Sequence, residues 1–165
     1  MQIEPLIKEI NDVDGMRRSV AVIRDSFSTV AAQFGLTEQN APTHPSNLTF
    51  ERLQMAKNKG LRLFGLFLAD DQVGFVAIDA SEAPVYHFER LAVLPDHRCH
   101  GHGEYLVQFA CDYIKRNGGE KVAIGIIDEH TALKKWYERL GFRETGTRKF
   151  AHLPFTVGFM EKVLR

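Results

Sequence analysis

Hydrophobic residues recur along this chain with two periods, one typical of strands and one typical of helices. Residues 3–10 alternate loosely and predict a first strand. The next segment predicts a helix with one apolar face, because its hydrophobic residues are separated by steps of three and four. These are Val13, Met16, Val20, Ile23 and Phe27. Asn11 or Asp12 can cap the start of this helix.

The helical pattern weakens over residues 28–47, which contain Gly35, Pro42 and Pro45. We expect a segment that is partly helical and partly irregular. A connection of this length within a domain is more often functional than idle, so its aromatic and polar residues are candidates for a substrate pocket. These candidates are Phe27, Phe34, His44 and Asn47. The alternative is a surface loop with a few anchoring aromatic residues.

The rest of the chain alternates between the two periods. We expect helices over residues 50–58, capped by Ser46 or Thr49, over 105–114, and over 133–140, capped by Asp128 or Thr131. We expect strands over residues 61–69, 73–80, 86–94, 122–127, 142–150 and 155–164. The order βααβββαβαββ predicts a mixed α/β sheet, mostly antiparallel, with helices on both faces. Residues 1–165 form one expected domain.

Composition narrows the class of protein. Hydrophobic residues make up 44% of the chain and charged residues 25%, as in ordinary globular proteins. The formal net charge is zero, which argues against a nucleic-acid partner. No apolar run approaches the ~20 residues of a membrane span, and the charged N-terminus predicts no signal peptide. Two cysteines make no disulfide framework, so we expect a reducing, cytoplasmic setting.

A glycine loop joins the strand 86–94 to the following helix. Its sequence is Arg98-Cys99-His100-Gly101-His102-Gly103. Backbone N–H groups at a helix start lack intrahelical partners, and the helix dipole favours an anion there. Glycines also let a ligand approach the backbone closely. The loop therefore predicts a phosphate-bearing ligand, although neither the P-loop lysine nor a G-x-G-x-x-G pattern is present.

Two motifs indicate which ligand this is. Arg98-x-x-Gly101-x-Gly103, preceded by Leu91-Ala92-Val93, resembles the acetyl-coenzyme A motif of the GNAT superfamily of N-acetyltransferases. The run Trp136-Tyr137-Glu138-Arg139-Leu140-Gly141-Phe142 is similar to that family's Y-E-x-L-G-F signature. The resemblance implies acetyl-coenzyme A as co-substrate and an amine as acceptor. It also implies cofactor contacts by the backbone of Leu91, Ala92 and Val93, by Arg98, Cys99, His100, Gly101, His102, Gly103 and Glu104, and by His130.

Glu89 is the candidate general base. It lies two residues before Leu91, in the alternation Val85, His87, Glu89, Leu91, Val93, which should share one face. We expect burial in this apolar strand to raise the pKa of Glu89. In the family, an acidic residue at the matching place often takes the amine proton, commonly through water. The alternatives are a structural ion pair, with Arg90 or with a neighbouring strand, and His87 as the base.

Tyr137 is the candidate general acid for the leaving thiolate. The family places this tyrosine near the coenzyme A sulfur, and unperturbed phenol and thiol pKa values differ by only about 1.5. The alternative is a core tyrosine, because its spacing with Leu133 and Leu140 fits packing equally well.

Three histidines depart from the family pattern. His100 stands where lysine or arginine is frequent, His102 replaces a small or aliphatic residue, and His130 replaces an asparagine. His130 could bind coenzyme A or act only as a polar residue near a helix start. His97, Cys99, His100 and His102 have the residue types of a zinc site, but their spacing is that of no recognised motif, so we expect no metal.

The leading interpretation is therefore an enzyme that acetylates a small-molecule amine. Two alternatives are an acetyltransferase for a protein or ribosomal N-terminus and a non-catalytic acyl-coenzyme A-binding domain. Many members of the resembled family are homodimers, so a homodimer is an expectation by analogy.

Overall fold

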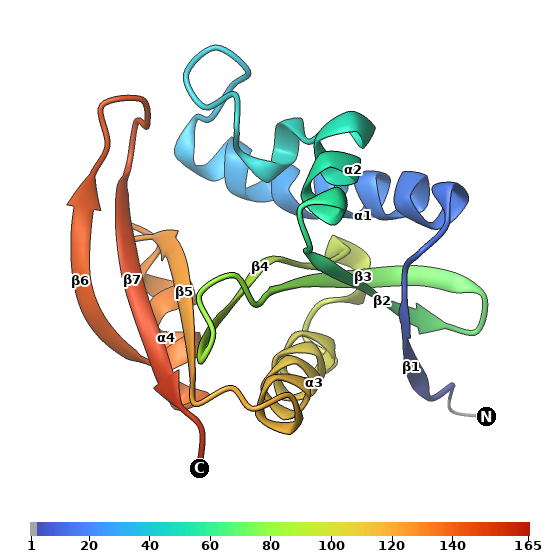
Figure 1. Cartoon of the computed structure of the whole chain (residues 1–165). Coiled ribbons are helices and arrows are strands. Elements are labelled where there is room, and N and C mark those ends of the chain that lie inside the picture. Colours follow the sequence, from blue (N-terminus) through green and yellow to red (C-terminus); the bar gives the residue numbers. More distant parts are fainter. Residues whose placement is uncertain (1–2) are drawn as a thin grey trace.

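The computed structural model describes residues 3–165, which form a sheet between two helical layers (Figure 1). The elements in chain order are β1 (Pro5–Glu9), α1 (Val13–Phe34), α2 (Phe50–Asn58), β2 (Arg62–Leu68), β3 (Asp71–Asp79), β4 (Val85–Val93), α3 (His102–Arg116), β5 (Lys121–Ile127), α4 (Thr131–Arg139), β6 (Arg143–Lys149) and β7 (Thr156–Val163). The expected order and the mixed sheet with helices on both faces are confirmed. Two short 3₁₀ turns, Pro45–Asn47 and Pro95–His97, lie in connections.

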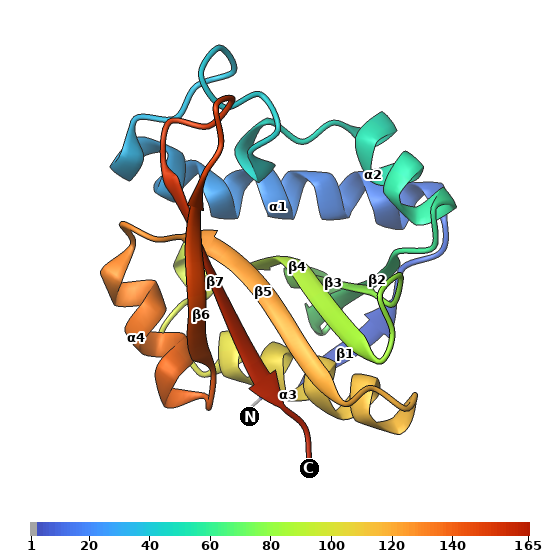
Figure 2. The same ribbon diagram turned by 60° about the vertical axis from the view of Figure 1, so that its left-hand side comes forward.

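The strands follow the order β1-β2-β3-β4-β5-β7-β6 across the sheet. Helices α1 and α2 cover one face, where Met16, Ile23 and Leu53 pack on Phe75. Helices α3 and α4 cover the other face, where Leu106, Ile114 and Tyr137 join a second cluster of buried residues (Figures 1 and 2). We refer below to the α1/α2 face and the α3/α4 face.

The sheet opens between β4 and β5. This is its parallel pair, and it is joined at only three positions: Val85–Lys121, Tyr86–Val122 and His87–Ala123. Beyond them β4 continues beside β3, and β5 continues beside β7 (Figure 2). The two strands therefore separate after His87 and Ala123, leaving two strand edges that face a gap.

A β-bulge in β4 lies at this opening. The pairing with β3 jumps from Ala77–Glu89 to Phe75–Ala92, and Arg90 adopts a left-handed conformation with φ 55°. Phe88 belongs to the core on the α3/α4 face, whereas Ala92 belongs to the core on the α1/α2 face. In an unbroken strand Phe88 and Ala92 would point to the same face. The bulge therefore reverses the face to which the residues after it point.

That exchange corrects the expected alternation. Leu91 and Val93 pack against the cluster on the α3/α4 face. Glu89 points the other way, because its β3 partner Ala77 lies in the core of the α1/α2 face. The expectation that Glu89, Leu91 and Val93 share one face was therefore wrong.

The ends of the helices agree with the sequence at most positions. Asp12 caps α1, accepting a hydrogen bond from Gly15 N–H, and Thr49 caps α2. Helix α1 continues to Phe34, so the irregular segment begins later than its composition indicated. Helix α4 is capped by His130, and not by Asp128 or Thr131. Within residues 3–165, no helix is both long and apolar enough to cross a membrane.

Candidate active site

The loop between β4 and α3 has the geometry of an anion site. Cys99 and Gly101 have φ values of 64° and 82°, which turn the chain into α3. A Cβ atom on Gly101 would meet no atom within 4 Å, so its backbone faces open space. The first N–H groups of α3, from His102 to Glu104, have no intrahelical acceptor. These residues fit the phosphate groups of coenzyme A.

Gly103 brings α3 close to α4. A Cβ atom built on Gly103 would lie 3.2 Å from Cζ2 of Trp136. The second glycine of the loop therefore leaves room for the indole of the second motif. The two sequence motifs meet at this contact.

Arg98 stabilises the frame of the loop. Its guanidinium donates to the Val93 carbonyl at 3.1 Å, to Thr29 Oγ1 at 3.0 Å and to the Ser26 carbonyl at 2.7 Å. The side chain thus ties the end of β4 to α1. Sequence reasoning missed Ser26 and Thr29, because nothing in the pattern of a helix identifies its tertiary partner.

The loop histidines form a small cluster. The rings of His100 and His102 are stacked, with centroids 6.1 Å apart, and His100 Nδ1 lies 2.6 Å from the Arg98 carbonyl. Partial burial, and then the neighbouring His100 and His97, lower the pKa of His102. Residues 3–165 contain no group of three or more His, Cys, Asp or Glu side chains arranged to hold a metal ion.

Glu89 is not buried as expected. Its side chain is 44% exposed and forms an ion pair with Arg90, so the predicted burial of this carboxylate was wrong. The reason is the opening of the sheet, which leaves no neighbouring strand beside Glu89 on the β5 side among the described residues. The carboxylate is accessible to a ligand on the α1/α2 face.

Tyr137 lies in the core, at 4% exposure. Its ring packs edge-on against Trp136 and Phe142 and lies 6.2 Å from the ring of Phe88. Burial, reinforced by nearby Cys111, raises the pKa of the phenol, which makes it a weaker acid than its ordinary value suggests. Tyr137 approaches β4 from the α3/α4 face, and Glu89 lies on the α1/α2 face.

The remaining candidates have packing contacts. His130 accepts a hydrogen bond from Leu133 N–H at 3.4 Å, and its ring lies 5.4 Å from that of Phe34. His44 is buried against Phe27, and burial lowers its pKa to about 4. The Asn47 amide donates to the Ala41 carbonyl at 3.0 Å. Of residues 28–47, His44 and Asn47 therefore form contacts inside the protein, as expected for a loop with anchoring residues.

Sequence reasoning did not single out Gly125. It lies in β5 beside the opening and is exposed, although the strand was expected to be buried. An isolated glycine inside an apolar strand was an available signal, because it often marks a place where a ligand or another backbone approaches closely.

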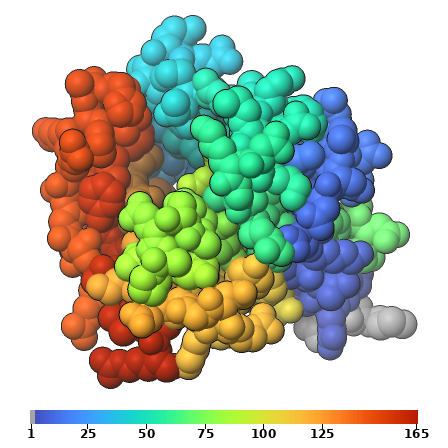
Figure 3. Space-filling view, viewed as in Figure 1, coloured from blue at the N-terminus to red at the C-terminus, as the bar shows by residue number. Residues whose placement is uncertain are grey.

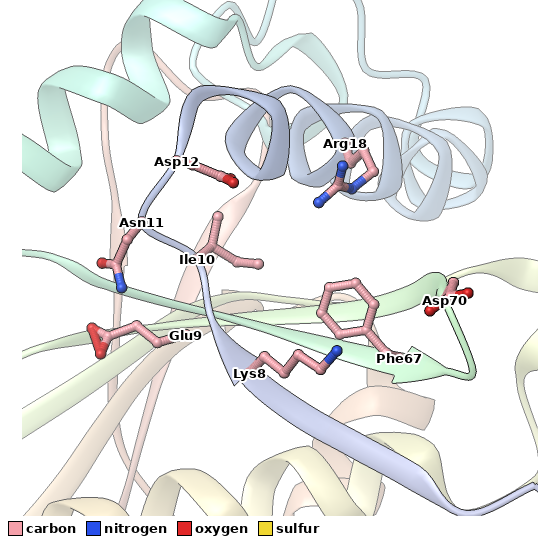
Figure 4. A pocket seen from close by; sticks show the side chains of 8 residues that line it. All are labelled: Lys8, Glu9, Ile10, Asn11, Asp12, Arg18, Phe67 and Asp70. Carbon is pink, nitrogen blue, oxygen red and sulfur yellow. The ribbon is translucent and has the colours of Figure 1, made fainter.

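A separate hollow lies near the start of α1 (Figure 4). Its lining comes from β1, the start of α1, β2 and the β2–β3 turn. The residues are Lys8, Glu9, Ile10, Asn11, Asp12, Arg18, Phe67 and Asp70. None of them belongs to the predicted site.

Three solved structures illustrate the similarity of the fold. The chain superposes on the PaiA N-acetyltransferase of Thermoplasma acidophilum in complex with coenzyme A with a TM-score of 0.74, at 15% identity over 98% of this chain and 99% of that one. For the ribosomal-protein-S18-alanine N-acetyltransferase of Escherichia coli the TM-score is 0.74, at 16% identity over 98% and 94%. For a spermidine N-acetyltransferase chimera of Vibrio cholerae SpeG and hSSAT it is 0.71, at 17% identity over 97% and 95%.

No protein of curated function matches the chain in sequence. The family model described as acetyltransferase (GNAT) family matches residues 29–142, which include both motifs, the opening of the sheet and the glycine loop. The chain therefore belongs to the acetyltransferase (GNAT) family and is an acetyl-coenzyme A-dependent N-acetyltransferase.

Proposed function

We propose that the acceptor is a small-molecule primary amine, that Glu89 takes its proton, and that Tyr137 protonates the leaving thiolate. The observation that carries this proposal is the opening between β4 and β5. Glu89 lies beside it on the α1/α2 face, and Tyr137 packs near it on the α3/α4 face. A base and an acid on opposite sides of one gap suit a reaction in which the amine enters as the thiolate leaves.

The glycine loop and the free edge of β4 would hold acetyl-coenzyme A. Backbone N–H groups of residues 99–104 suit its phosphates, and the unpaired edge of Leu91–Val93 suits its amide-containing arm. When bound, acetyl-coenzyme A supplies the acetyl group as a thioester, in which an amine nitrogen can replace sulfur on the acetyl carbon. His130, at the start of α4, would contact the bound cofactor beside Phe34, whose ring lies 5.4 Å away.

Glu89 would act as an accessible carboxylate. It attracts an ammonium group and accepts a proton from the nitrogen, directly or through water. Its pairing with Arg90 does not prevent this role, because exposed ion pairs contribute only about 0–1 kcal/mol. The buried phenol of Tyr137 retains its proton over the neutral range, so the proton is present when the thiolate forms.

Calorimetry followed by an amine panel tests the proposal. Acetyl-coenzyme A and desulfo-coenzyme A should bind saturably, and NAD should not. Transfer should then be measured by thiol release with monoamines, spermidine and a peptide that begins with alanine. Absence of acetyl-coenzyme A binding, or transfer to the peptide alone, would overturn the proposed small-molecule activity.

A further inference from the structure

The position of Gly125 relative to Glu89 indicates what kind of amine fits. Their strands pair in parallel up to His87–Ala123, and the next position on the same face is Glu89 on β4 and Gly125 on β5. Ile124 and Ile126, on either side of Gly125, belong to the core of the α3/α4 face. Gly125 therefore faces the α1/α2 side, as Glu89 does.

The row continues onto β7. Phe159 is the direct cross-strand partner of Gly125, so it points to the same face, where it is 37% exposed. Val157, two residues away, lies on this face and is half-buried. A Cβ atom on Gly125 would lie 3.5 Å from Val157 and 3.9 Å from Phe159, at ordinary contact distances. One row across the opening thus contains the carboxylate of Glu89, the backbone of Gly125 and the aromatic ring of Phe159.

In the space-filling view the surface is recessed between β7, shown in red, and the light-green β3–β4 turn (Figure 3). Adjacent strands are about 4.8 Å apart, so the ring of Phe159 lies about two strand spacings from β4, or more because the sheet opens there. A group that rests on Gly125 is then only a few bonds from an amine held at Glu89.

On the β7 side of the row, the charges suit a single cation. Towards β7 the next carboxylate on this face is Glu161, which is already paired with Lys121 at 3.3 Å. Beyond it, Arg143 and Arg148 are the β6 partners of Glu161 and Val157. A second ammonium group placed along the row would approach these cations instead of a free carboxylate.

We propose that the acceptor is a primary monoamine with an aromatic or branched apolar group, which packs on Gly125 between Val157 and Phe159 while the amine meets Glu89. This inference rests on the proposed function and names its substrate class. The apolar group gains burial by covering Gly125, which is exposed, and the amine gains a charged partner.

Steady-state kinetics with three acceptors tests the proposal. We expect phenethylamine to have a higher kcat/KM than spermidine or an alanine peptide. Calorimetry with unacetylated coenzyme A present should also show phenethylamine binding in the absence of transfer. Preference for spermidine or the peptide would overturn this inference but leave the acetyltransferase activity in place. If no amine is acetylated although acetyl-coenzyme A binds, the proposed function fails and the inference with it.

Variants locate the apolar group. Gly125→Val fills the floor with a residue that suits a strand, and Phe159→Ala removes the aromatic wall. Each should lower kcat/KM for phenethylamine by about tenfold or more, the usual effect of a changed hydrophobic pocket. Affinity for acetyl-coenzyme A should stay the same in Phe159→Ala.

The matched control is Val163→Ala, because Val163 is an exposed apolar residue on the same strand and face as Phe159, four residues away. It should behave as the unchanged protein. If Phe159→Ala and Val163→Ala have the same kinetics, the apolar group does not lie on this row and the proposal is wrong.

Discussion

Glu89 stands at the point where β4 leaves β5, and its exposure makes its role directly testable. Glu89→Gln keeps the shape of the side chain but removes the proton acceptor. We expect kcat to fall by about a hundredfold, at the low end of the usual contribution of a general base. Rates should be measured across pH, with calorimetry to show that acetyl-coenzyme A still binds.

The control for this variant is Glu144→Gln. Glu144 is also an exposed, ion-paired glutamate, but it contacts Lys134 on α4 and so lies on the opposite face. It should leave kcat unchanged. If Glu89→Gln also retains full activity, Glu89 has no part in proton transfer, and His87, the preceding residue on that face, becomes the base to test.

His102 should couple coenzyme A binding to protonation. In the free protein its pKa is lowered by partial burial and by His100 and His97. A phosphate nearby favours the imidazolium form and raises the pKa, so binding takes up protons. Affinity for acetyl-coenzyme A should therefore fall as pH rises. The total fall is about threefold for each half unit by which the pKa of His102 in the bound protein exceeds that in the free protein.

Calorimetry in two buffers with different ionisation enthalpies measures this proton uptake. His102→Asn should reduce it, whereas His152→Asn, which changes an exposed histidine of the β6–β7 turn, should not. Equal heats in both buffers for the unchanged protein would contradict a role for the loop histidines in phosphate binding.

At the scale of elements, Arg98 is the link between β4, the glycine loop and α1. Arg98→Ala removes three hydrogen bonds that hold the loop to Ser26, Thr29 and Val93. We expect it to lower the free energy of unfolding by about 1–3 kcal/mol, and to weaken acetyl-coenzyme A binding. Arg116→Ala, which loses one exposed hydrogen bond to the Asp112 carbonyl within α3, serves as the control. Urea unfolding and calorimetry measure both effects, and equal results for the two variants would contradict the link.

The elements were largely predictable, because their apolar periods are regular and their caps are common ones. The bulge at Arg90 was not. Glycine is the usual sequence signal for a left-handed backbone conformation, and here the residue is an arginine. The extra residue of the bulge becomes apparent only when β4 is paired with β3. The cap of α4 was missed for a similar reason: His130 is an uncommon capping residue beside Asp128 and Thr131, which are common ones.

The candidate site was predicted in part. The glycine loop could be found because glycines and a helix start have a local signature. The burial of Glu89 could not be judged, because exposure there depends on the separation of two strands far apart in sequence. Tyr137 illustrates a different limit of sequence reasoning. Its spacing from Leu133 and Leu140 is compatible both with packing in the core and with a catalytic role.

At the scale of the whole molecule, two parts of one sheet meet at three residue pairs, and α1 with the segment after it extends across both. His44 belongs to that segment and is buried in its neutral form, with its pKa lowered to about 4. Unfolding restores an ordinary pKa near 6.5, so the unfolded chain binds more protons between pH 6.5 and 4. Stability should therefore fall as pH falls through this range.

His44→Asn removes the titrating group. We expect it to flatten the loss of stability between pH 6.5 and 4 by about 2–3 kcal/mol, because each pH unit between the folded and unfolded pKa values corresponds to about 1.4 kcal/mol. The variant itself is less stable at neutral pH, since it loses the contact with Phe27. Thermal unfolding at several pH values measures the slope, and a slope identical to that of the unchanged protein would contradict the assignment.

The contact between Gly103 and Trp136 has an optical consequence. Trp136 is the sole tryptophan of the chain, and its indole lies against the second glycine of the loop. All tryptophan emission therefore originates beside the candidate phosphate site. The protein carries its own spectroscopic reporter, so titrations of nucleotides can be followed by intrinsic fluorescence without a label.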